Sequence, residues 1–71
     1  MTAPRTPTQS QVRAAIAHHG RECEAALRCA HTAETAGLSA GMIDGFRKLA
    51  ATHSDDAFKW ARHLRRPGGA A

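Results

Sequence analysis

The most constraining feature of this sequence is a heptad pattern of small and apolar residues in its first half. Its members recur at alternating steps of four and three: Val12, Ile16, His19, Cys23, Ala26, Ala30 and Ala33. Such steps place every member on one side of an α-helix and create a seam for a second helix. The pattern predicts one long helix over residues 6–36. We expect this helix to continue through Gly20, although glycine there costs about 1 kcal/mol relative to alanine.

Capping residues define the ends of this predicted helix. Thr6 and Gln9 form a Thr-x-x-Gln capping box, and Thr8 with Gln11 repeats the same box two residues later. The start is therefore expected at Thr6 or two residues beyond it. Gly37 is suited to the C-terminal cap, where the backbone often turns left-handed.

Two shorter helices are predicted to follow, over residues 39–52 and 55–66. Ser39 and Ser54 are each expected to cap the N-terminus of one of them. Each helix has its own apolar stripe: Met42, Phe46, Leu49 and His53 in the second, and Ala57, Trp60, Ala61 and Leu64 in the third. The expected connections are very short.

The whole chain, residues 1–71, is therefore predicted to be a single all-α domain. It is expected to be a small three-helix protein with one long and two shorter helices, while residues 1–5 and 67–71 form loose ends. Large apolar side chains are few: Val12, Ile16, Leu27, Leu38, Met42, Ile43, Phe46, Leu49, Phe58, Trp60 and Leu64. A small chain with so few of them buries little surface alone. We expect a helical dimer or a permanent protein partner to supply the remaining burial.

The sequence lacks the patterns on which catalysis depends. It has no glycine-rich phosphate loop, no nucleophile elbow and no paired-carboxylate site. We therefore expect a non-enzymatic protein with no cofactor and no small-molecule substrate. No apolar run approaches 18 residues and the first ten lack a signal-peptide core, so no membrane insertion is expected and the predicted location is the cytoplasm.

The leading functional hypothesis is docking on a protein complex. The expected contact residues are Phe58, Trp60, Arg62 and Arg66, because Trp and Arg dominate interface energetics and Phe58 falls outside the third helix's apolar stripe. Alanine supplies sixteen residues and Arg outnumbers Lys eight to two, and both Ala and Arg are encoded by GC-rich codons. A bacterial, phage or mobile-element adaptor or inhibitor is the expected class.

The alternative hypothesis is nucleic-acid binding through the last helix. The net charge is +4, and residues 57–71 hold four bases and no acid: Lys59, Arg62, Arg65 and Arg66. A basic helical stripe can neutralise phosphates, although bases at a helix end also complement the helix dipole without any ligand. The last two helices could form a helix-turn-helix, but Asp55 and Asp56 would then face the phosphates.

A metal site has weak candidates in this sequence. His19 and Cys23 are four residues apart and therefore share a helix face, as paired zinc ligands must. No second pair has ligand spacing, so one chain offers no closed four-ligand site from its sequence. Only a symmetric dimer that brings two His19–Cys23 pairs together would complete such a site.

Overall fold

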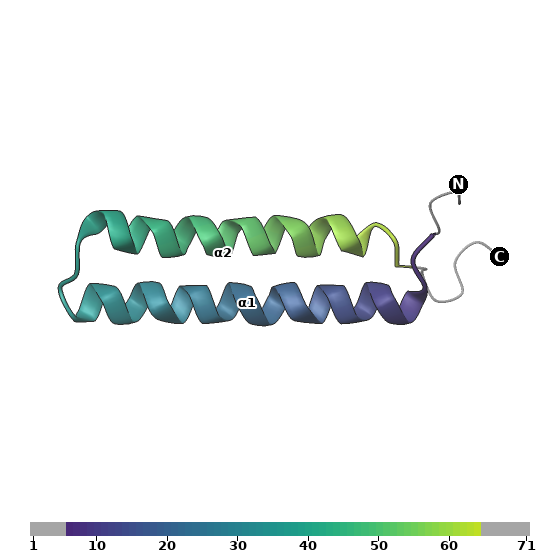
Figure 1. Ribbon diagram of the computed structural model, residues 1–71, viewed down its shortest axis with the longest axis horizontal. Helices are drawn as coiled ribbons and strands as arrows, with labels where there is room; N and C mark the ends of the chain where they lie inside the picture. The colour runs from purple at the N-terminus through teal and green to yellow at the C-terminus, as the bar shows by residue number, and fades with distance from the viewer. Residues whose placement is uncertain (1–5, 65–71) are drawn as a thin grey trace, which may run out of the picture.

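The computed structural model describes residues 6–64, which form an antiparallel hairpin of two helices (Figure 1). Helix α1 spans Gln9–Thr35 and helix α2 spans Ala40–Ala61. The described residues contain no strand, so the prediction of an all-helical chain is confirmed for this part of the sequence.

The prediction of three helices is wrong. Helix α2 runs without a break from Ala40 through Ser54 to Ala61, so the described parts of the helices expected over 39–52 and 55–66 are joined in one helix. Residues 52–56 contain neither proline nor glycine, and serine inside a helix costs less than about 0.7 kcal/mol relative to alanine. A break there would leave carbonyl and amide groups without helical partners at two new helix ends. Continuation is therefore favoured over a cap at Ser54.

The seam of α2 explains why the break is absent. Residues that face α1 or lie beside it recur in steps of three and four across the whole helix: Ile43, Phe46, Ala50, His53, Ala57 and Trp60, all buried or half-buried. The two stripes predicted for separate helices were partly misplaced. Met42 and Leu49 are each 49% exposed, and Ala61 and Leu64 are exposed as well.

Helix α1 begins at the second of its two possible capping boxes. The Thr8 hydroxyl accepts a hydrogen bond from the Gln11 amide at 3.0 Å, and the Thr8 amide donates to the Gln11 side chain at 2.9 Å. The expected start at Thr6 is therefore two residues too early. Both sides of this box satisfy amides that the first helical turn leaves without partners.

The connection between the helices is a tight turn centred on Gly37. Its φ of +72° is the left-handed conformation expected of a C-terminal glycine. The Leu38 amide donates to the Ala33 carbonyl at 2.9 Å and the Gly37 amide to the Glu34 carbonyl at 3.1 Å. These two bonds form a Schellman motif, after which Ser39 caps α2 by accepting from the Met42 amide at 3.2 Å.

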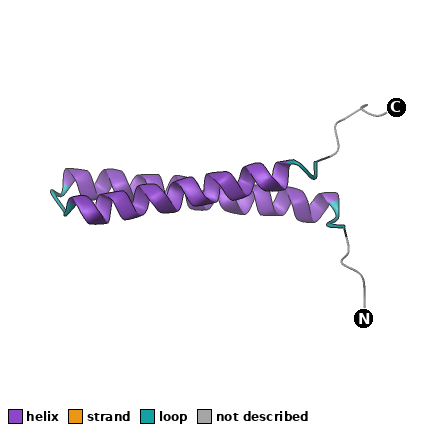
Figure 2. Cartoon of the chain, turned by 90° about the horizontal axis from the view of Figure 1, so that it is seen from above, coloured by secondary structure: helices purple, strands orange, loops and turns teal. Residues whose placement is uncertain are grey.

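The predicted seam of α1 packs against α2. Among the described residues, the buried side chains are those of Val12, Ala26, Ala30, Ala33 and Ala50. The remaining members of the α1 seam are half-buried, and Gly20 does not interrupt the helix. Seen from above, the helices cross at a shallow angle, as alanine-lined helices do when their backbones approach closely (Figure 2). The hairpin is one layer thick, and its core contains one fully buried large side chain, Val12.

Candidate functional site

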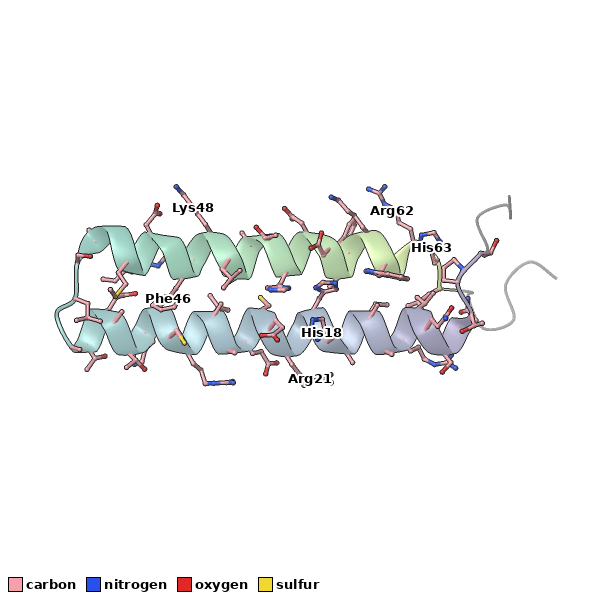
Figure 3. The ribbon with its side chains drawn as sticks, in the orientation of Figure 1. His18, Arg21, Phe46, Lys48, Arg62 and His63 are labelled. Atoms are coloured by element: carbon pink, nitrogen blue, oxygen red, sulfur yellow. The ribbon has the colours of Figure 1, made fainter. Side chains whose placement is uncertain are left out.

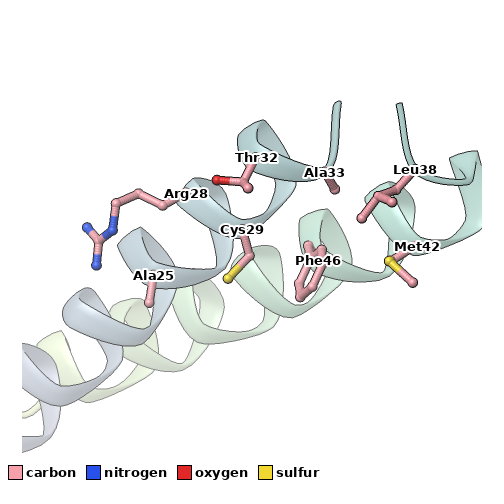
Figure 4. A pocket seen from close by; sticks show the side chains of 8 residues that line it. All are labelled: Ala25, Arg28, Cys29, Thr32, Ala33, Leu38, Met42 and Phe46. Atoms are coloured by element: carbon pink, nitrogen blue, oxygen red, sulfur yellow. The ribbon is translucent and has the colours of Figure 1, made fainter. Parts of the chain in front are cut away.

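An open apolar groove lies beside the turn that joins the helices (Figure 4). Its volume is about 570 Å³, and it is lined by Ala25, Arg28, Cys29, Thr32 and Ala33 of α1 with Leu38, Met42 and Phe46 at the turn and in α2. Small side chains on α1 leave this space, because they cannot fill the gap beside larger residues of α2. Arg28 is the only charged residue in the lining.

A further exposed apolar side chain, Leu49, lies beyond the groove along α2. Leu49 follows Met42 by seven residues, which places both on the same side of the helix. Leu38 is 46% exposed, and Met42 and Leu49 are each half-exposed, so the hairpin leaves much of their apolar surface in solvent. Met42 and Leu49 were predicted to lie on the apolar stripe of the second helix. The three-and-four steps from Ile43 through Trp60 define the seam of α2 that faces α1, and Met42 and Leu49 lie beside that seam.

The opposite face of the hairpin has fewer exposed apolar side chains. Phe58 follows Leu49 by nine residues, or two and a half helical turns, and so points the other way. Phe58 is 69% exposed and Leu27 of α1 is 52% exposed. More of the exposed large apolar side chains of the two helices and their turn therefore lie on the groove side.

Of the described residues expected to contact a protein partner, Phe58 and Arg62 are exposed and four residues apart, whereas Trp60 is half-buried. Trp60 borders a shallow pocket with Pro7 and His63. The Trp60 ring centroid lies 6.0 Å from that of His63. Arg62 points away from α1 (Figure 3). Arg66 lies outside the described residues.

The basic end of α2 is only partly described. Lys59 and Arg62 are exposed, while Arg65 and Arg66 lie outside residues 6–64. The predicted helix-turn-helix is wrong, because the two helices it requires are one continuous helix. Asp55 is exposed in the middle of α2, four residues before Lys59, so acidic and basic groups alternate on its outward face.

A cluster of histidines lies between the helices near the middle of the hairpin. The Nδ1 atoms of His19 in α1 and His53 in α2 are 2.9 Å apart. Asp56 of α2 joins them, and one potential ligand atom from each of the three residues lies within 4.8 Å of the others. His18 is adjacent, with its ring centroid 5.1 Å from that of His19 and 6.2 Å from that of His53. Among the described residues, His19, His53 and Asp56 form the group that could hold a metal ion.

Of the two candidate metal ligands expected from the sequence, His19 and Cys23, one belongs to this cluster. His19 belongs to it, but Cys23 is not a member of the three-residue group. Cys23 is half-buried and Cys29 is exposed, and both are free thiols. His53 and Asp56 escaped the sequence reasoning because they were assigned to different helices. Their spacing of three residues places them on one face of a single helix.

Comparisons with known proteins give no relative for this chain. No protein-family model matches it, and neither curated proteins nor solved structures provide a match. Neither α1 nor α2 is sufficiently long and apolar to span a membrane. Function is therefore inferred from the groove, the basic end and the histidine cluster.

Proposed function

We propose that this chain is a non-enzymatic protein-binding module that works as a homodimer, with its apolar groove docked on a second copy. The observation that carries this proposal is the half-exposed apolar surface from Leu38 through Met42 to Leu49. A contiguous apolar surface on a small chain marks an interaction site. The dimer would bury that surface on both copies.

The small core of the hairpin supports a second copy as the occupant. One valine and four alanines are buried among the described residues, which is little apolar burial for two helices of 27 and 22 residues. Chains this short usually need a further source of stability. A second copy is present wherever the chain is made, and two helical hairpins stacked face to face form a four-helix bundle.

The charges around the groove are compatible with this arrangement. The lining has one charged residue, Arg28, whose side chain extends away from the apolar centre (Figure 4). Two-fold docking would bring the apolar surface around Met42 and Leu49 of one copy against the same surface of the other. Phe58 and Arg62 would stay on outer surfaces, available to a further protein partner.

Sedimentation equilibrium of the full chain tests the proposal. We expect a dimer at micromolar concentration, and we expect Met42→Glu or Leu49→Glu to weaken dimerisation by more than about 100-fold, because each buries a carboxylate in an apolar interface. Phe58→Glu is the matched control on the opposite face and should leave the dimer intact. A monomeric wild-type chain, or a dimer that only Phe58→Glu disrupts, would overturn the proposed interface.

The second candidate function is phosphate binding by the basic end of α2. Lys59 and Arg62 are exposed and have no ion-pair partner among the described residues, which favours a role for them in binding an anion. If nucleic acid binds there, affinity for a short DNA duplex should fall steeply between about 50 and 200 mM salt. Lys59→Ala with Arg62→Ala should flatten that dependence. No binding at low salt would eliminate this candidate.

A further inference from the structure

Two imidazoles and one carboxylate converge in the middle of the hairpin, and none of the three residues lines the groove. His19 comes from α1, and His53 with Asp56 comes from α2. All three side chains are half-buried, so they are partly withdrawn from water while one side stays accessible. Metal sites in helical bundles are built in this way, from side chains that project inward from facing helices.

The contact between the two histidines brings two ligand atoms to one point. Their Nδ1 atoms are 2.9 Å apart, so one ring donates a proton to the nitrogen lone pair of the other. Two imidazole nitrogens bound to one tetrahedral zinc ion lie about 3.3 Å apart, given Zn–N bonds of about 2.0–2.1 Å. A metal ion would replace the shared proton once the nitrogens moved apart by a few tenths of an ångström and both rings turned to aim their lone pairs at the ion.

Asp56 adds a negative charge beside this pair. It follows His53 by three residues, which places both side chains on the same face of α2. Among the described residues, its half-buried carboxylate has neither a hydrogen bond nor an ion pair. A bound cation would stabilise a carboxylate in this setting, because its charge compensates for the hydration that the carboxylate has lost.

The backbone already holds the three residues at the required positions. His19 and His53 occupy the seams of their helices, and the packing of buried alanines nearer the turn fixes how the helices approach each other. The site is thus largely formed before any ion binds. Preorganisation of this kind lowers the entropic cost of binding.

From this geometry we propose that His19, His53 and Asp56 bind one divalent transition-metal ion per chain, with zinc as the preferred ion. Two nitrogens and one carboxylate oxygen suit zinc and its neighbours, whereas magnesium and calcium prefer oxygen ligands alone. Three protein ligands leave a fourth position for water or for another side chain. His18 is the nearest further histidine. The site uses neither Cys23 nor the groove residues.

Calorimetric titration of the full chain without a polyhistidine tag tests this site. We expect one zinc ion per chain, no heat of binding with magnesium, and a higher unfolding temperature when zinc is present. His53→Ala and Asp56→Asn should each weaken zinc binding by more than about tenfold. Far-UV circular dichroism should show that both variants stay helical.

Matched variants distinguish this site from other zinc ligands of the chain. His31→Ala removes an exposed histidine of α1 that is outside the cluster, and Cys23→Ala removes the thiol of the alternative dimer site. Both should bind zinc as tightly as the wild type does. The proposal is overturned if wild-type protein binds no zinc, if His31→Ala weakens binding as much as His53→Ala, or if one ion binds per two chains.

Discussion

The Gln9 side chain donates a hydrogen bond to the main-chain carbonyl of His63 across 54 residues of sequence, at 2.8 Å. This bond joins the first residue of α1 to the segment just beyond α2, at the end of the hairpin opposite the turn. The Schellman motif holds the other end, so a side-chain bond fixes the open end of the antiparallel pair and backbone bonds fix the turn. The carbonyl of His63 lies beyond the last helical residue, where no helical amide would satisfy it.

Substitution of Gln9 should loosen this open end. We expect Gln9→Ala to lower the free energy of unfolding by about 0.5 kcal/mol, since the bond is exposed and the lost interaction is partly replaced by water. Native-state hydrogen exchange should be faster for amides of residues 61–64. Ser10→Ala is the control, because Ser10 is exposed beside Gln9 and makes no cross-helix hydrogen bond among the described residues. Equal exchange rates in Gln9→Ala and wild type would contradict the contact.

Two serines distinguish a continuous α2 from two separate helices. Ser54 lies inside α2, so Ser54→Ala should stabilise the protein by about 0.5 kcal/mol through better helix propensity. Ser39 caps α2, so Ser39→Ala should destabilise it by about 1 kcal/mol. Chemical denaturation followed by circular dichroism measures both. Destabilisation by Ser54→Ala of the size seen for Ser39→Ala would indicate a helix start at Ser54.

Two glycines are predicted to respond to alanine in opposite directions. A Cβ at Gly20 meets no atom within 4 Å, so Gly20→Ala should raise the free energy of unfolding by about 0.5–1 kcal/mol, as glycine in a helix interior is unfavourable. Gly37 has a φ of +72°, so Gly37→Ala should lower the free energy of unfolding by about 1–2 kcal/mol. Thermal unfolding measures both. A loss of stability in Gly20→Ala would mean that the substitution disturbs the helix pairing.

The first helix could be predicted closely from local signals. The heptad steps from Val12 to Ala33, the capping box and Gly37 all act within a few residues, and the structure has α1 at Gln9–Thr35 rather than 6–36. The prediction of a new helix at Ser54 was wrong, because a capping residue indicates only where a helix could begin. Whether it does begin there depends on the packing of Ile43 through Trp60 against α1.

The candidate site was less predictable than the helices. His19 was identified from its spacing to Cys23, but its partners in the structure are His53 and Asp56, which lie more than thirty residues further along the chain. The groove was missed because it arises from small side chains on α1 facing larger ones near the turn. Local spacing places Met42 and Leu49 beside the seam of α2 and His53 with Asp56 on one face, but it does not show what α1 brings opposite them.

The sequence alone determined that the chain is helical, where α1 lies, where the turn falls and that large apolar side chains are scarce. These properties follow from helix propensity, capping and heptad spacing, which are interactions between residues near each other in the chain. Only the tertiary structure decided that residues 40–61 form one helix, that His19 meets His53, and that Met42 and Leu49 flank an open groove. These depend on the register between two antiparallel helices, which is set by packing between residues far apart in sequence.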